Sequence, residues 1–416
     1  MKRPALAAVA CLAITTALAA DPLPRATPDS VGMSSQRLGR IALVINADVA
    51  AGRLPGAVIA IARKGKLVYF ESFGYLDKAG EIPMPKDAIF RIASMTKPLV
   101  GVGTMMLVEE GRMFLSDPVG RHLPSLAKLQ VAVVRKDASG NETVEMEPAK
   151  RQPTIQDLLR HTSGITYGYS GNTSVHKNYP LSSTVSSITY TGAEFIEKMS
   201  SLPLLNHPGT EWDYGLSTDV LGLAMEAITK QSLGEFLDAR LFKPLGMKDS
   251  GFIVPPDKAA RYAKALPNDP DTGKPQSVPD STKPGKFECG GGCVASTAAD
   301  YLRFAQMMLN RGRLEDRQIL GRKSVELMTA DHLGPEVRTE MPGYGFGLTM
   351  AVRRQAGISA SLGSEGEYTW FGAFGTHFWV DPKEQLVVVF MAHIPGPIGG
   401  HYNRVIKSLV LQALVD

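Results

Sequence analysis

The sequence predicts an α+β fold in which an antiparallel sheet, flanked by helices, is joined to a mainly helical subdomain. Strand patterns gather near both ends of the chain, in 57–74 and in 343–393, whereas helical patterns fill the middle. The strand patterns form hairpins with short turns and not repeated strand–helix–strand units, which favours antiparallel pairing. We therefore expect the first and last segments to share one sheet.

The length of the chain favours two subdomains. With 416 residues, of which 44% are hydrophobic, the chain can bury a large core and is long for one compact unit. We expect residues 20–125 and 295–416 to form the sheet subdomain and residues 126–294 to form the mainly helical one. A crevice between two such subdomains is a usual place for a binding site.

The N-terminus has the pattern of a secretory signal peptide. Lys2 and Arg3 precede an Ala-rich apolar run that ends at Ala17-Leu18-Ala19, so we expect residues 1–19 to be removed after Ala19. A membrane anchor is the alternative, but the run is short for a bilayer span. The sequence thus predicts a periplasmic or secreted protein without stable membrane insertion.

Charge and cysteine content narrow the range of partners. The formal net charge is only +4, and no basic patch or Arg-rich helix stands out, so we expect no nucleic-acid partner.

Cys289 and Cys293 bracket three glycines and form either a small-loop disulfide or two free buried residues. Two cysteines without a nearby His make no zinc site, and NDPDTG (268–273) lacks the spacing of a calcium loop, so we expect no metal and no cofactor. The oligomeric state stays open.

The N-terminal third contains three clear elements. Residues 34–52 have helical periodicity and end in Gly52. The stretch AVIAIARKGKLVYFESFG predicts two strands joined at Lys64-Gly65. The apolar run after Ser94 predicts a buried helix that ends near Gly111.

The middle of the chain is predicted to be helical with two irregular stretches. Residues 131–147 predict an exposed hairpin that turns at Ser139-Gly140, and 155–164 predict a short helix with Gly164 as its C-terminal cap. Residues 165–190 are rich in Tyr, Ser, Thr and Gly, and we expect them to form a long loop that walls a site. Residues 264–288 are rich in Pro, Asp and Lys and should also be loop.

The C-terminal part returns to the sheet. A helix is expected from Ala298, followed by strands within 343–354 and 367–393, with a turn at Asp381-Pro382-Lys383. A helix over 403–415 closes the chain.

The stretch RIASMTKP holds the first candidate catalytic residues. Ser94 and Lys97 are three residues apart, so they project from the same face of a helix. A hydroxyl and an amine held this close can be a nucleophile and its activating base, although a Ser cap and a solvated Lys have the same spacing. A Ser at a helix start can donate its own N–H to an oxyanion, and burial lowers the pKa of a Lys toward the neutral, basic form.

The rest of the chain indicates which further residues act with Ser94 and Lys97. No Gly-x-Ser-x-Gly elbow is present, which argues against a Ser-His-Asp triad and makes His161 and His377 structural. Tyr214, in HPGTEWDYGLSTDVLG, lies where a helix begins, and near a Lys it could become a phenolate base.

Six ordered motifs make the chain resemble the serine β-lactamase-related family. They are RIASMTKP, VEEGRMFLSDPV, LLRHTSG, PGTEWDYGLSTDVLG, PLGMKDSGF and GGGCVASTAADY. This family holds class C β-lactamases, D-alanyl-D-alanine carboxypeptidases and family VIII carboxylesterases, and the resemblance extends from about Pro28 to the end of the chain. It implies a β-lactamase/penicillin-binding-like fold.

The resemblance also implies roles for individual residues. Ser94 corresponds to the nucleophile, Lys97 to its activating partner and Tyr214 to a proton shuttle. The strand of the third motif reads Trp370-Phe371-Gly372-Ala373, in which Gly372 keeps space for a close backbone approach and the Ala373 N–H joins that of Ser94 in an oxyanion hole.

Two departures from the class C pattern bear on the substrate. Leu216 stands where that pattern has Asn, and Trp370 and Phe371 replace the Lys and Thr of Lys-Thr-Gly. Amide, cation and hydroxyl groups that would hold a peptide or penicillin are thus replaced by apolar side chains. With Gly372 and Tyr169, these residues are the predicted substrate contacts, and the pattern resembles that of family VIII esterases.

The sequence therefore predicts a serine carboxylesterase that cleaves short-chain esters through an acyl-Ser94 intermediate, with a small-molecule ester as its partner. A class C-type β-lactamase or D-alanyl-D-alanine carboxypeptidase is the alternative within this mechanism. A penicillin-binding-like module without catalysis is the alternative from another class.

Overall fold

The structure is a computed structural model that describes residues 21–416. The predicted signal peptide, residues 1–19, and Cys11 lie outside the described residues. Among the described residues, no helix is both long and apolar enough to cross a membrane.

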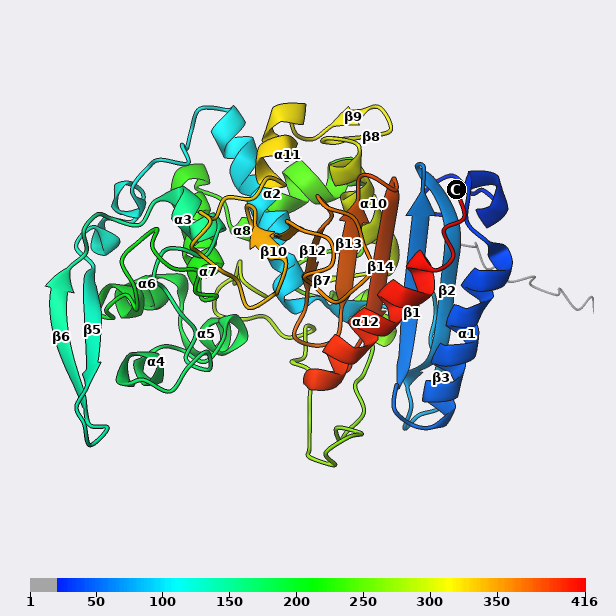
Figure 1. The fold of residues 1–416 in the computed structure, drawn as a ribbon, viewed down its shortest axis with the longest axis horizontal. Coiled ribbons are helices and arrows are strands. Elements are labelled where there is room, and N and C mark those ends of the chain that lie inside the picture. Colours follow the sequence, from blue (N-terminus) through cyan, green and yellow to red (C-terminus); the bar gives the residue numbers. More distant parts are fainter. Residues whose placement is uncertain (1–20) are drawn as a thin grey trace, which may run out of the picture.

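One eight-stranded antiparallel sheet organises the molecule, as predicted (Figure 1). Its spatial order places the N-terminal hairpin beside the C-terminal strand β14, because Val58 pairs with Met391 and Ile61 with Val388. In spatial order its strands are β10 (Tyr344–Phe346), β11 (Ala351–Arg353), β12 (Tyr368–Phe371), β13 (His377–Asp381), β14 (Leu386–Ala392), β1 (Gly56–Arg63), β2 (Lys66–Asp77) and β3 (Ile82–Pro83).

Both faces of the central strands are buried, which explains why GAVIAIAR and LVVVFMA are almost continuously apolar. Alternate residues of β1 point to opposite faces: Ile59 packs with the helices α1 (Ser35–Ala50) and α12 (Pro397–Leu411), and Val58 packs on the other side. That second side is covered by α2 (Thr96–Glu109) and α10 (Ala298–Leu309), which belong to the larger core.

A group of helices lies beside the sheet and carries a separate hairpin that projects away from it (Figure 1). The hairpin consists of β5 (Gln130–Lys136) and β6 (Glu142–Pro148). The helices are α3 (Ile155–Leu159), α4 (Ser174–Asn178), α5 (Ser183–Thr189), α6 (Gly192–Ser200), α7 (Ser217–Thr229), α8 (Leu233–Leu237) and α9 (Lys243–Leu245).

Short elements connect these parts. A π-helical turn at Asp238–Phe242 joins α8 to α9, and α11 spans Arg322–Met328. Two-residue strands pair as β4 (Phe90–Arg91) with β7 (Ala295–Ser296), and as β8 (Arg313–Leu314) with β9 (Arg317–Gln318).

Three local predictions were wrong. Residues 165–190 contain the helices α4 and α5, each begun by a Thr or Ser side chain that accepts a backbone hydrogen bond. The helix that begins at Ile155 ends at Leu159, so Gly164 is not its cap; a Cβ at Gly164 would lie 2.3 Å from the carbonyl oxygen of Asn206. The last helix begins at Pro397, six residues before the predicted start.

Candidate active site

Ser94 lies in a tight 3₁₀ turn, Ala93–Met95, that leads directly into α2. The turn forces Ala93 to φ +44°, a left-handed conformation that costs a residue with a Cβ about 1–3 kcal/mol. Strain of this kind persists only where the surroundings hold it, and it marks functional turns. The turn presents the Ser94 hydroxyl next to the first residues of α2.

Lys97 is fully buried one turn after Ser94. Its Nζ donates to the Ser94 Oγ at 3.2 Å, to the Tyr167 hydroxyl at 3.2 Å and to the Gly291 carbonyl at 2.7 Å. Burial lowers the pKa of Lys97 from 10.5 to about 7, although the negative charge of Asp219 opposes this shift. Near neutral pH a large fraction of Lys97 is therefore an uncharged amine that can accept a proton from Ser94.

Tyr214 completes the cluster. The Lys97 Nζ lies 4.5 Å from the centre of the Tyr214 ring, and the Trp370 indole N–H donates to the Tyr214 hydroxyl at 3.2 Å. Burial raises the pKa of Tyr214 above its ordinary value, and a hydrogen bond with Ser94 only partly opposes this. The phenol therefore stays protonated near neutral pH, which corrects the expectation of a phenolate base: Lys97 is the better base and Tyr214 is suited to donate a proton.

A buried network that the sequence analysis missed surrounds Lys97. The Tyr167 hydroxyl and Ser183 Oγ are 3.0 Å apart, and Ser183 donates to Asp219 at 2.7 Å. Asp219 also accepts from the Gly291 N–H at 2.9 Å. Asp219 therefore orients Gly291 directly and Tyr167 through Ser183, and these are the two residues besides Ser94 that accept hydrogen bonds from the Lys97 amine. Asp219 is fully buried in the first turns of α7, among apolar residues. A charged residue inside an otherwise apolar helical stretch is costly to bury without a partner, so this sequence feature could have marked Asp219 as part of the site.

The end of β12 approaches Ser94 closely. A Cβ on Gly372 would lie 2.3 Å from the carbonyl oxygen of Ile92, so only glycine allows the strand end to reach the residues that precede Ser94. Ala373 follows at once and is exposed, whereas Gly372 is buried. The structure thus brings the predicted oxyanion-hole segment beside the Ser94 turn.

The predicted substrate contacts divide into two groups. Phe371 and Tyr169 are 39% and 60% exposed, and each stacks on an inner ring, Trp370 and Tyr167, with centroids 5.0 Å apart. Trp370 is only 3% exposed and donates its indole N–H to the Tyr214 hydroxyl, which differs from the expectation that its ring contacts the substrate. Leu216 is fully buried in the core, so its side chain offers no surface to a substrate.

The histidines near this region have structural partners. His161 is fully buried, accepts from the Gly215 N–H at 3.3 Å and lies 4.7 Å from the Tyr214 ring, and burial keeps its pKa well below the ordinary value. His377 contacts the Thr369 hydroxyl at 3.0 Å, and burial lowers its pKa to about 3. Both rings are therefore neutral near pH 7.

Cys289 and Cys293 form a disulfide, which selects the first of the two alternatives for this pair. The disulfide closes the loop that carries the Gly291 carbonyl toward Lys97. In residues 21–416, no group of three or more His, Cys, Asp or Glu side chains is placed to hold a metal ion.

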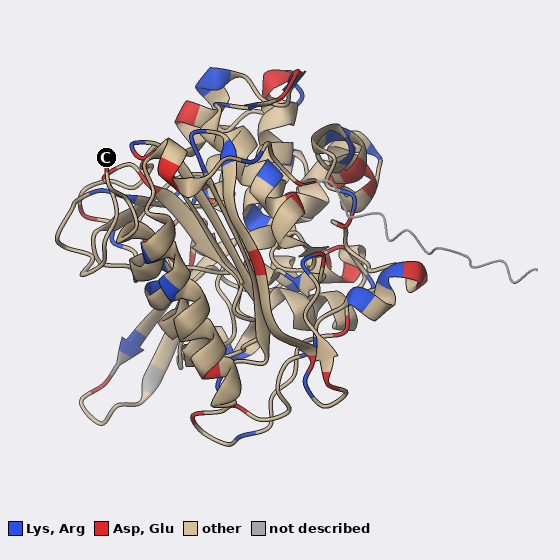
Figure 2. Ribbon diagram, turned by 90° about the vertical axis from the view of Figure 1, so that its right-hand side faces the viewer, with Lys and Arg blue, Asp and Glu red and all other residues tan. Residues whose placement is uncertain are grey.

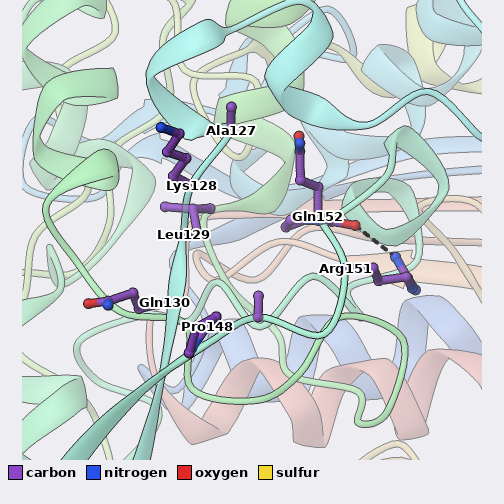
Figure 3. Close-up of a pocket in the computed structure, with 9 residues that line it drawn as sticks. Ala127, Lys128, Leu129, Gln130, Pro148, Arg151 and Gln152 are labelled. Carbon is purple, nitrogen blue, oxygen red and sulfur yellow. Dashed lines mark hydrogen bonds between the residues drawn. The ribbon is translucent and has the colours of Figure 1, made fainter.

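Two further surface features lie apart from this cluster. A pocket of about 340 Å³ lies at the base of the β5–β6 hairpin (Figure 3). In its lining, the Arg151 guanidinium donates to the Gln152 carbonyl at 3.0 Å. None of Ser94, Lys97 and Tyr214 lines this pocket. On the side that carries α1, basic and acidic residues are interspersed (Figure 2).

Comparison with known proteins identifies the family. A family model described as Beta-lactamase matches residues 41–410. Protein Rv1367c of Mycobacterium tuberculosis is 35% identical over 360 residues, which cover 83% of this chain and 87% of the relative. Esterase EstB of Burkholderia gladioli is 30% identical over 363 residues, which cover 82% of this chain and 86% of EstB.

Solved structures agree on the fold. Simvastatin synthase (LovD) from Aspergillus terreus matches with a TM-score of 0.76 at 24% identity, over 90% of this chain and 98% of LovD. The match of the family model over residues 41–410 and the similarity to EstB show that the chain belongs to the beta-lactamase family and is related to its family VIII esterases.

Proposed function

We propose that the protein is a serine carboxylesterase that cleaves small uncharged esters through an acyl-Ser94 intermediate. The observation that carries the proposal is the contact between the Ser94 hydroxyl and the buried Lys97 amine, whose pKa lies at about 7. Esterase EstB, a relative with 30% identity, supports an ester-cleaving serine hydrolase.

In the first half-reaction, neutral Lys97 takes the proton of Ser94 as Oγ attacks the ester carbonyl carbon. The negative charge that develops on the carbonyl oxygen is stabilised by the N–H groups of Ser94 and Ala373. Tyr214 donates its hydroxyl proton to the leaving alkoxide, and the Lys97 ammonium restores that proton. An alcohol leaves, and the acyl group stays on Ser94.

In the second half-reaction, water replaces the alcohol. Tyr214 takes the proton of the attacking water while it passes its own hydroxyl proton to Lys97, which is again neutral, and the same two N–H groups stabilise the second oxyanion. The bond between Ser94 and the acyl carbon then breaks, the Lys97 ammonium returns its proton to the Ser94 Oγ, and a carboxylic acid is released.

The preference for uncharged esters rests on the rings at the end of β12. Phe371 presents an exposed apolar ring where a β-lactamase or D-alanyl-D-alanine carboxypeptidase holds a polar group for the substrate carboxylate. Desolvating a carboxylate against such a ring without an ionic partner costs on the order of several kcal/mol. An uncharged short-chain ester avoids this cost.

The test compares substrate classes with purified enzyme. We expect kcat/KM for p-nitrophenyl acetate or butyrate to exceed that for benzylpenicillin or a D-Ala-D-Ala peptide by about a hundredfold or more. Ser94→Ala should remove ester hydrolysis and leave the melting temperature unchanged. Equal efficiency on penicillin would favour the β-lactamase alternative, and absence of turnover on every substrate would favour a module without catalysis.

We also propose that the protein is exported to the periplasm or secreted. The basic and Ala-rich N-terminus and the Cys289–Cys293 disulfide, which forms in oxidising compartments, support this location. Cell fractionation and N-terminal sequencing should find the mature chain outside the cytoplasm and beginning after Ala19. A cytoplasmic protein with an intact N-terminus would contradict the proposal.

A further inference from the structure

A second cavity, of about 780 Å³, lies next to the disulfide and apart from the candidate active site. Its lining residues come mainly from α5, from the Phe252-Ile253 pair and from residues 279–288, and they include Arg91 and Cys293. None of Ser94, Lys97 and Tyr214 lines it. Cavities of about 300–1,000 Å³ are the usual size for small-molecule ligands.

Arg91 is a buried cation without an anionic partner. Its side chain is 6% exposed, and its guanidinium donates to three neutral acceptors: Ser281 Oγ at 3.3 Å, Thr184 Oγ1 at 3.1 Å and Cys293 Sγ at 3.2 Å. The Arg91 Nε is buried without a hydrogen-bond acceptor. Among the described residues, Arg91 forms no ion pair with an Asp or Glu carboxylate, and an unpaired buried charge of this kind is costly.

The carboxylates that line the cavity are engaged elsewhere. Glu226 accepts from the Leu233 N–H at 2.9 Å, and Glu288 accepts from the Gly234 N–H at 2.6 Å. Asp280 accepts from the Thr282 N–H at 2.9 Å and lies 3.7 Å from Lys283. None of these carboxylates forms an ion pair with Arg91, and two further cations, Lys283 and Lys286, line the cavity as well.

The other walls are largely apolar. Ile188, Val185, Phe252, Ile253 and Phe287 line the same cavity as Arg91. A single guanidinium matches one carboxylate, to which it can donate two parallel hydrogen bonds. Apolar walls match a hydrocarbon chain.

We propose that this cavity binds a monocarboxylate with an apolar chain, with the carboxylate on Arg91 and the chain along the apolar walls. The site is separate from the chemistry at Ser94, so it does not depend on the esterase proposal. The bound carboxylate supplies the negative charge that the protein itself does not place beside Arg91.

Octanoate and its neutral counterpart octanamide test the proposal by isothermal titration calorimetry. The protein carries Ser94→Ala, so hydrolysis plays no part. We expect one octanoate per chain and at least about tenfold weaker binding of octanamide, because hydrogen bonds to a charged group are the stronger ones. Equal affinity for both compounds would overturn the proposal.

A matched pair of variants locates the binding. Thr184→Asp places a carboxylate beside the Arg91 guanidinium, where the Thr184 hydroxyl now accepts at 3.1 Å, and should weaken octanoate binding about tenfold or more. Thr184→Asn has the same shape without charge and should retain binding. In the enzyme with native Ser94, both variants should hydrolyse p-nitrophenyl acetate as the parent does. Equal octanoate affinity in the two variants would place octanoate elsewhere and refute the site.

Discussion

The titration of Lys97 leads to a quantitative prediction for the pH dependence of ester hydrolysis. Burial lowers the pKa of Lys97 from 10.5 to about 7. Since one pKa unit corresponds to about 1.4 kcal/mol, the protein destabilises the ammonium form relative to the neutral amine by about 5 kcal/mol. Only the neutral amine accepts the proton of Ser94. With a pKa of about 7, the neutral fraction rises from about 9% at pH 6 to about 90% at pH 8, so kcat/KM should rise about tenfold over this range.

Asp219→Asn is the perturbation that tests this assignment. The Asp219 carboxylate raises the pKa of Lys97 and so partly offsets the effect of burial. Removing its charge should lower the pKa of Lys97 further, and the rise in kcat/KM should move to lower pH. Asn keeps an oxygen that can accept from the Gly291 N–H, so the loop should stay in place.

The assay follows p-nitrophenyl butyrate at the isosbestic wavelength of the product, which removes the pH dependence of detection, and the Ser94→Ala protein gives the background rate. Asp213→Asn is the matched control, since burial raises the pKa of Asp213 to about 6 and this carboxyl also titrates nearby. Lys97 is not the group that titrates if Asp213→Asn moves the rise in kcat/KM, or if Asp219→Asn leaves the rise unchanged or moves it to higher pH.

Three further predictions concern the support of the site. Gly372→Ala should lower kcat/KM sharply, because its Cβ would meet the Ile92 carbonyl at 2.3 Å; activity equal to that of the parent in steady-state assays would contradict the close approach. Trp370→Phe should lower kcat about two- to tenfold, since one hydrogen bond to the Tyr214 hydroxyl is lost, and an unchanged kcat would show that this bond is not used. Reduction of the disulfide at Cys289 should lower turnover by loosening the loop that contacts Lys97, whereas a thiol reagent alone should have no effect; inhibition of the unreduced enzyme by that reagent would show a free thiol.

Local sequence patterns were enough to predict most of the sheet. The helix from Ala298 buries apolar side chains at helical spacing, whereas the first strand of the hairpin at Lys64-Gly65 and the strand Leu386–Ala392 are nearly continuous apolar runs, because both of their faces are buried. The pattern failed in 165–190, where Ser and Thr begin short helices and Tyr167 is buried. Those helices depend on packing against the rest of the molecule, which their composition does not reveal.

Sequence spacing by itself determined that Ser94 and Lys97 share one helical face, because three residues is nearly one turn. Only the tertiary structure decided which groups surround them. Asp219 and Gly291 are 72 residues apart yet hydrogen-bonded, and their arrangement around Lys97 depends on how α7 and the disulfide loop pack together. The same packing excludes water from Lys97 and thereby sets its pKa, which spacing along a chain does not encode because desolvation is a property of the whole surrounding core.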